Sequence, residues 1–372
     1  MSKPVRILQI VGGMDMGGIE NFIMNIYRNI DRTKVQFDFF IHNDKDAIFE
    51  EEIRELGGKI FKIPHITKSG HRAYIKNLKN FFKEHKEYKI IHSHRDELNG
   101  LVLKEAKKFG IKVRISHSHN AYPKYISFLG KLYKNYYLSQ VNKYATERFA
   151  CSQVAGEWMY GKNKNFKIIN NGIDVKKYTF NEKIRKIKRI ELNLKENEIA
   201  IGHIGRFVLQ KNHEFLIDIF NELLKINNNY KLFLIGEGEN QEKIKAKVKE
   251  LNIKKNVIFL GVRKDINEVL QGIDLFLLPS FHEGLPVTLV EAQGAGLKCF
   301  ISDTVTKEID LECGLTEFIS LEKSPEKWAD IIDKNKNYLR KDTTESLRKH
   351  GYDMTENAKN LQNIYLKLYG KN

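Results

Sequence analysis

Short apolar runs alternate with amphipathic stretches along most of the chain, and the same plan occurs twice. In the first half, VRILQIVGG (5–13) predicts a strand and IENFIMNIYRNI (19–30) a helix, because its apolar residues recur at helical spacing. The second half repeats this order, from IAIGHIG (199–205) to KCFIS (298–302). Strand-helix alternation is typical of parallel sheets covered by helices on both faces. We therefore expect an α/β protein.

The length of 372 residues exceeds that of one ordinary core and indicates two domains. The dipeptide Asn171-Gly172 is a strong turn signal at mid-chain. We place an N-terminal domain at 1–172 and a C-terminal domain at 173–352. Residues 353–372 are expected to form a helix that packs back on the N-terminal domain.

Cysteine content and hydropathy restrict the class of protein. The three cysteines are widely spaced and lack the ligand spacing of a zinc site, so neither a disulfide framework nor bound zinc is expected (Cys151, Cys299, Cys313). No run of 18 apolar residues and no leader-cleavage pattern occurs. These features predict a cytoplasmic protein.

Positive charge is concentrated in the first half of the chain. The net charge is +16, from 63 Lys and Arg against 47 Asp and Glu, and residues 1–175 carry +12 of it, from 30 cations and 18 anions. Such a surface suits nucleic acid, anionic lipid or phosphorylated substrates. A lysine-rich surface that serves only solubility is the alternative interpretation.

Two cations follow a predicted strand in GRFVLQKN (205–212). Arg206 and Lys211 can clamp a diphosphate, since arginine binds phosphate as a fork and lysine as a point charge. Ligands of parallel sheets bind beyond the carboxyl ends of the strands, which favours this interpretation. Surface cations without a ligand are the alternative for this segment taken alone.

The segment SFHEGLPVTLVEA (280–292) also follows a predicted strand. Pro286 suits the first turn of a helix. This placement leaves the amides of Gly284 and Leu285 near the positive end of that helix, where anions bind without a metal.

Two glutamates stand eight positions apart in the same segment. Glu291, inside the predicted helix, can accept hydrogen bonds from both hydroxyls of a ribose. Glu283, in the loop before it, can bind the hydroxyls of a sugar. Solvated glutamates at the start of a helix are the alternative for either residue alone.

As a set, these segments resemble the retaining, nucleotide-sugar-dependent glycosyltransferases of family four. The GT-B fold of that family consists of two Rossmann-like domains that face each other across a cleft. Fragments that extend the resemblance over nearly the whole chain are GGMDMGGIE (12–20), VRISHSHN (113–120), INNGID (169–174), LIGEGE (234–239) and VIFLG (257–261).

The resemblance implies a role for each of these segments. Glu291 would hold the donor ribose, Glu283 the transferred sugar, and Arg206 with Lys211 the diphosphate. Base recognition in the family uses backbone atoms of two further segments, here around Gly236, Gly238 and Val262. The implied catalytic set is His117, Glu283, Arg206 and Lys211, and the implied donor-binding set is Gly17, Gly18, Arg206, Lys211, Gly236, Gly238, Val262, Glu283, Gly284, Leu285, Pro286 and Glu291.

The loops of the first half are interpreted from their residue spacing and from the family resemblance. GGMDMGG lacks the G-x-G-x-x-G spacing of a dinucleotide fingerprint, so a nicotinamide cofactor is not expected. Gly17 and Gly18 would let the backbone approach a phosphate or sugar, and a plain tight turn is the alternative. The family places a sugar-contacting histidine at the end of the strand that carries His117 and His119. We favour His117 and interpret His92 and His94 as structural.

Neither a metal nor another cofactor is expected. The two cations and the helix amides would stabilise the leaving diphosphate electrostatically.

Residues 122–148 are rich in tyrosine and lysine, with Glu147 as their one acidic residue. Tyrosines and lysines on a helix suit an anionic membrane surface. We expect Lys124, Lys131 and Lys134 to face a membrane or an acceptor. Core packing and a nucleic-acid surface are the alternatives.

Taken together, these features predict a metal-independent retaining glycosyltransferase on the inner face of the plasma membrane. It would move a sugar from a nucleotide sugar, by default a UDP-sugar, to a lipid-linked or growing saccharide in surface polysaccharide biosynthesis. The alternatives are a non-hydrolysing nucleotide-sugar epimerase and a basic nucleic-acid-binding protein. No helix-turn-helix, zinc or RNA-recognition signature supports the latter, and no nucleic-acid partner is expected.

Overall fold

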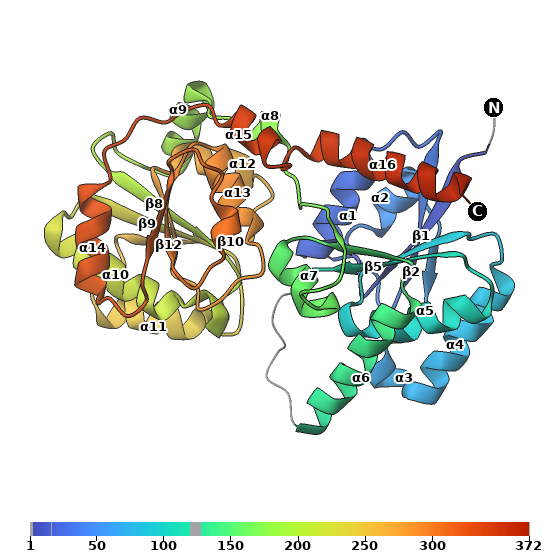
Figure 1. Ribbon diagram of the computed structural model, residues 1–372. Coiled ribbons are helices and arrows are strands. Elements are labelled where there is room, and N and C mark those ends of the chain that lie inside the picture. The colour runs from blue at the N-terminus through green and yellow to red at the C-terminus, as the bar shows by residue number, and fades with distance from the viewer. Residues whose placement is uncertain (1–2, 16, 120–127, 372) are drawn as a thin grey trace. The chain divides into compact units, whose positions relative to one another are not determined.

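The computed structural model describes residues 3–15, 17–119 and 128–371, and the chain divides into two compact units (Figure 1). One unit comprises Met1–Gly172 with Asp353–Asn372, and the other comprises Ile173–Tyr352. The chain thus leaves the first unit after the Asn171-Gly172 turn and returns to it at Asp353.

Seven parallel strands form the sheet of the first unit, in the order β3-β2-β1-β4-β5-β6-β7. The order reverses between β1 and β4, which is the position where doubly wound sheets bind ligands. The strands are β1 (Val5–Val11), β2 (Val35–Ile41), β3 (Ile60–Lys62), β4 (Ile90–Ser93), β5 (Val113–Ser118), β6 (Glu147–Ala150) and β7 (Lys167–Ile168).

Helices cover both faces of this sheet, as buried parallel strands require. The described helices are α1 (Gly18–Asn29), α2 (Glu50–Glu55), α3 (Ile66–Ser69), α4 (His71–Glu84), η1 (Asp96–Leu98), α5 (Asn99–Lys108), α6 (Phe128–Tyr144), α7 (Gln153–Tyr160) and α16 (Met354–Gly370). Helix α16 packs beside α1 and against β1 and β2. Its residues Ala358, Leu361 and Tyr365 are buried in the core that α1 also lines.

Six parallel strands form the sheet of the second unit, in the order β10-β9-β8-β11-β12-β13. They are β8 (Ile199–Ile204), β9 (Tyr230–Ile235), β10 (Val257–Gly261), β11 (Leu275–Leu278), β12 (Lys298–Ser302) and β13 (Thr316–Ile319). The order reverses between β8 and β11, so the loops that follow these two strands lie at the switch point on the carboxyl edge of the sheet.

The second sheet also has a hydrophobic core on each face. Its helices are α8 (Val175–Tyr178), α9 (Glu182–Glu191), η2 (Leu209–Lys211), α10 (His213–Ile226), α11 (Gln241–Glu250), α12 (Ile266–Gly272), α13 (Val287–Gly294), η3 (Lys307–Ile309), α14 (Pro325–Lys334) and α15 (Thr344–Lys349). The α/β class expected from the sequence is confirmed, with two Rossmann-like units.

Candidate functional site

Four loops of the second unit meet at the carboxyl edge of its sheet, because β10, β9, β8 and β11 are neighbours in that order. They carry most of the donor-binding residues expected from the sequence. Arg206 and Lys211 follow β8, Gly236 and Gly238 follow β9, Val262 follows β10, and the segment 279–286 follows β11.

Direct contacts join the loops after β8 and β11 at the switch point. The backbone N–H of Phe281 donates to the carbonyl of Gln210 at 2.9 Å, and the Gln210 amide donates to the carbonyl of His282 at 2.8 Å. Lys211 Nζ lies 2.7 Å from Glu283 Oε1. This ion pair is largely shielded from water, since the Glu283 side chain is 8% exposed and that of Lys211 is 15% exposed.

The sequence did not predict this pairing. It assigned Lys211 to a diphosphate and Glu283 to a sugar, and the structure holds the two side chains together. Arg206 is exposed and has no ion pair with any carboxylate in the described part of the chain. Of the two cations, Arg206 is therefore the one whose charged group is open to a phosphate.

Close packing of two loops explains the glycines after β9. Gly236 has a φ of +133°, and a Cβ there would lie 2.2 Å from the Gly205 carbonyl oxygen. A Cβ on Gly238 would lie 2.6 Å from the carbonyl oxygen of Phe207. Two backbone hydrogen bonds fix this approach, from Phe207 to Glu237 at 3.1 Å and from Asn240 to Phe207 at 2.9 Å. Both glycines thus hold the Arg206 loop in place.

Helix α13 begins at Val287, and Pro286 is its N-cap residue, one position later than the sequence suggested. Gly284 and Leu285 precede it with partly exposed surface. Two hydroxyl oxygens of the segment that leads into and opens this helix, Ser280 Oγ and Thr288 Oγ1, are buried and have no hydrogen-bond partner among the described residues. Unsatisfied hydroxyls beside a helix N-terminus are suited to a bound anion.

Glu291 lies in α13, where the hydroxyl of Tyr178 donates to its Oε1 at 2.6 Å. Burial raises the pKa of Glu291 to about 7, although the hydrogen bond from Tyr178 opposes the rise. The carboxyl group therefore titrates near neutral pH. Nothing in the sequence around Tyr178, the last residue of α8, marks it as a partner of this glutamate.

In the first unit, four histidines lie together at the ends of β4 and β5. His92 Nε2 is 3.1 Å from His117 Nδ1, and His94 Nδ1 is 2.8 Å from His119 Nε2. Burial lowers the pKa of each of them below its ordinary value, to about 3 for His119. All four rings are therefore neutral at pH 7.

The burial of these rings changes the preference between the two candidate sugar contacts. His117 is 0% exposed, because Phe22, Phe149 and the other histidines enclose its ring. His119 is 9% exposed. The structure thus makes His119 the more accessible candidate. His92 and His94 are buried and hydrogen-bonded, as expected of structural histidines.

Three of these histidines lie close enough to share a metal ion. One ring nitrogen each of His92, His94 and His117 lies within 4.8 Å of the others. In the structure, however, their ring nitrogens form hydrogen bonds with one another and with Gln9 and Tyr365.

The glycine-rich loop after β1 leads into α1. Gly17 is the N-cap residue of this helix and has extended backbone angles. A Cβ on Gly18 would meet no atom within 4 Å, so space is open beside it. This geometry is compatible with a close ligand and equally with a plain turn.

The tyrosine and lysine segment is only partly described. Lys124 lies outside the described residues, and Lys131 and Lys134 lie in the part of α6 whose side chains are not described. Further along α6, Tyr137 and Val141 are buried, while Tyr136 is exposed. No helix in the described ranges is long and apolar enough to cross a membrane.

The chain is similar to known glycosyltransferases. Residues 16–177 match the model of Glycosyltransferase Family 4, and residues 184–353 match that of Glycosyl transferases group 1. The putative glycosyltransferase EpsF of Bacillus subtilis (strain 168) is 32% identical over 372 residues, which are 98% of this chain and 97% of that protein. The capsular polysaccharide biosynthesis glycosyltransferase CapH of Staphylococcus aureus is 24% identical over 345 residues, 89% and 90% of the two chains.

Similarity to a solved structure confirms the expected GT-B fold class. The crystal structure of Anabaena Alr3699/HepE in complex with UDP and glucose has a TM-score of 0.78 to this chain, at 19% sequence identity. The match covers 98% of this chain and 100% of that one.

Proposed function

Because this chain belongs to the glycosyltransferases, with a family 4 domain followed by a group 1 domain, we propose that it transfers a sugar from a UDP-sugar. The acceptor is a lipid-linked or growing saccharide, and the transfer retains the configuration at the anomeric carbon. The observation that carries the proposal is the Lys211–Glu283 ion pair at the switch point of the second sheet, with Arg206 exposed in the same loop after β8. That UDP and glucose are bound in the similar structure supports the donor class.

In this proposal the diphosphate lies beside Arg206 and Lys211. Two cations and the N-terminus of α13 can offset the negative charge that develops on the leaving diphosphate, so the reaction needs no metal. Lys211 then contacts both the diphosphate and Glu283, and it fixes the carboxylate that receives the hydroxyls of the transferred sugar.

Glu291 holds the ribose in the same arrangement. Its carboxyl group has one oxygen engaged by Tyr178. When it is ionised, this carboxylate can accept hydrogen bonds from both ribose hydroxyls, whereas the protonated group keeps fewer acceptor sites, so nucleotide binding should weaken as pH falls through the pKa of about 7.

The acceptor belongs to surface polysaccharide biosynthesis, as the name of the CapH relative suggests. The excess of positive charge in the first half of the chain favours an anionic acceptor or membrane. We place the protein at the inner face of the plasma membrane.

A transfer assay tests the proposed function. The protein is incubated with radiolabelled UDP-glucose, UDP-galactose or UDP-N-acetylglucosamine, with and without a prenyl-diphosphate-linked saccharide. We expect label in the lipid fraction with at least one donor, and only when acceptor is present. Conversion of the donor sugar without acceptor would instead identify the alternative function, that of a nucleotide-sugar epimerase.

Sedimentation with vesicles tests the membrane assignment. The wild type is expected to sediment with phosphatidylglycerol vesicles at low salt. A triple variant that neutralises Lys124, Lys131 and Lys134 loses about 3 kcal/mol of lipid attraction, at about 1 kcal/mol for each cation, and stays in the supernatant. Equal sedimentation of the two proteins would show that these lysines do not face the membrane.

A further inference from the structure

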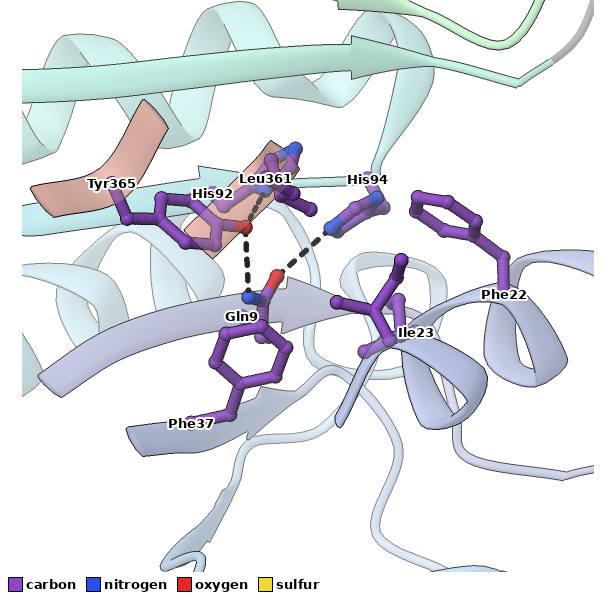
Figure 2. Close-up of a pocket in the computed structure, with 9 residues that line it drawn as sticks. Gln9, Phe22, Ile23, Phe37, His92, His94, Leu361 and Tyr365 are labelled. Carbon is purple, nitrogen blue, oxygen red and sulfur yellow. Dashed lines mark hydrogen bonds between the residues drawn. The ribbon is translucent and has the colours of Figure 1, made fainter. Parts of the chain in front are cut away.

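One short chain of hydrogen bonds runs from the centre of the first sheet to His119. Gln9, on β1, receives a hydrogen bond at its amide oxygen from His94 Nε2, at 3.0 Å (Figure 2). His94 Nδ1 lies 2.8 Å from His119 Nε2. The other ring nitrogen of His119, Nδ1, is buried and has no partner among the described residues.

The amide oxygen of Gln9 fixes the direction of this chain. Each neutral imidazole carries one N–H donor and one bare nitrogen. Because an amide oxygen only accepts, the proton of His94 is on Nε2 and its Nδ1 is bare. The partner of that bare nitrogen, His119 Nε2, must therefore be the donor. His119 is left with a bare Nδ1, which is a hydrogen-bond acceptor.

A second chain starts from the other end of the same amide. Gln9 Nε2 donates to the hydroxyl of Tyr365 at 3.3 Å, and this hydroxyl lies 2.6 Å from His92 Nδ1 (Figure 2). His92 Nε2 lies 3.1 Å from His117 Nδ1. The same reasoning makes the hydroxyl donate to His92, and His92 donate to His117. His117 Nε2 then carries a proton and is a donor without a described partner.

The two outer histidines thus have opposite hydrogen-bonding character, although their rings stack with centroids 4.1 Å apart. His119 presents an acceptor and His117 a donor. Rotation of the Gln9 amide by half a turn would exchange the donor and acceptor roles along both chains of hydrogen bonds. One buried side chain therefore sets the protonation pattern of both rings.

We propose that Gln9 is a positioning residue that holds His119 in the tautomer with a bare Nδ1, so that this nitrogen accepts a hydrogen bond from a sugar hydroxyl of the substrate. The sugar contact rests on the proposed function, and the tautomer does not. His119 takes this role because it keeps 9% exposure at the end of β5, whereas His117 keeps none. A bare imidazole nitrogen selects a hydroxyl and rejects a deoxy sugar at that position.

Nitrogen NMR of the full chain tests the tautomer without any substrate. Histidines are labelled with ¹⁵N, and His119→Asn assigns the signals of His119. At pH 7.5 we expect the wild-type ring to be protonated at Nε2 alone. Gln9→Met keeps the size of the side chain but removes the amide, and it should give a mixture of tautomers at His119. The matched control is Gln36→Met, which removes another buried glutamine of the same sheet, bonded to Tyr27, and should leave His119 unchanged.

A proton on Nδ1 of wild-type His119, or an unchanged tautomer in a folded Gln9→Met, would overturn the positioning role. Should Gln9→Met fail to fold, the tautomer of His119 measured in the wild type still decides the direction of the hydrogen bonds from Gln9 to His119.

Kinetics then test the sugar contact. We expect Gln9→Met to lower kcat about tenfold, the loss of roughly one hydrogen bond, with an unchanged Kd for UDP. An unchanged kcat would remove the sugar contact. A wild type that transfers no sugar would refute the proposed function, and the tautomer would still stand or fall by NMR.

Discussion

Two neighbouring cations of the second unit differ in what they contribute to the fold. Lys211 is paired with the buried carboxylate of Glu283, while Arg206 is exposed and unpaired with any described carboxylate. Removing the partner of a shielded charge destabilises a protein, because the remaining charge stays desolvated. Substitution of an exposed side chain without such a partner changes stability little.

Alanine substitutions should separate the two roles. Arg206→Ala is expected to weaken UDP binding by about 1.5 to 3 kcal/mol and to change the free energy of unfolding by less than about 0.5 kcal/mol. Lys211→Ala should weaken UDP binding and also lower the free energy of unfolding by roughly 2 kcal/mol. Calorimetric titration with UDP and urea unfolding measure the two effects. Lys254→Ala, at an exposed lysine after α11, is the control. Equal stability losses in the two variants would contradict the structural role of Lys211.

The raised pKa of Glu291 predicts how stability depends on pH. Its pKa is about 7 in the fold and 4.5 in the unfolded chain, so between these values the folded state binds more protons. The stability of the wild type should therefore fall as pH rises from 4.5 to 7, by at most roughly 3 kcal/mol, and stay level above 7. Glu291→Gln should lack this fall. Urea unfolding of both proteins at pH 5 and pH 8 measures the difference.

The same carboxyl group should make UDP binding sensitive to pH. Ribose hydroxyls donate to the ionised form, so the affinity of the wild type should fall as pH drops from 8 to 6, beyond any fall seen in Glu291→Gln. Parallel pH profiles for the two proteins would contradict the ribose contact.

At the scale of elements, loops after adjacent strands are held together by positions that only glycine can occupy. Gly236→Ala would force a Cβ against the carbonyl of Gly205 at a positive φ. Gly314→Ala is the matched control, since Gly314 also has a positive φ, +69°, but no atom lies within 4 Å of its Cβ position. We expect a cost of about 1 to 2 kcal/mol for the control and at least twice that for Gly236→Ala, measured by urea unfolding. Similar costs would show that the close approach is relieved by loop movement.

The sequence predicted the elements better than the contacts between them. Period and composition identified the strands, because parallel strands buried on both faces are continuous apolar runs such as that of β11. The Lys211–Glu283 pair was not predictable, because it joins loops 72 positions apart whose approach depends on strand order. Gln9 did carry a signal, as a polar residue inside the apolar strand VRILQIV. Nothing local indicated its partner Tyr365, 356 positions later.

At the scale of the whole molecule, the last helix belongs to the core of the first unit. Ala358, Leu361 and Tyr365 of α16 are buried with residues of α1 and β1. Each large buried side chain contributes about 1.5 to 3 kcal/mol. A chain ending at residue 352 should therefore lose the folded first unit and keep the second, which has its own cores.

Calorimetry of the truncated chain tests this expectation. We expect the truncated chain to show one unfolding transition, at a temperature that UDP raises. The full-length protein, which has two folded units, should show two transitions. Two transitions in the truncated chain would show that α16 is dispensable for the first core.

The chain leaves the first unit after Gly172 and returns to it at Asp353, which determines the order in which the two units can be completed during synthesis. A ribosome releases the N-terminal part first, and domains usually fold in that order. Here the first unit lacks α16 until Met354–Gly370 leaves the exit tunnel, whereas all of Ile173–Tyr352 emerges before that. The second unit is thus the first that can complete its fold. The core of the first unit stays incomplete until then, and we expect this part of the nascent chain to depend most on a chaperone.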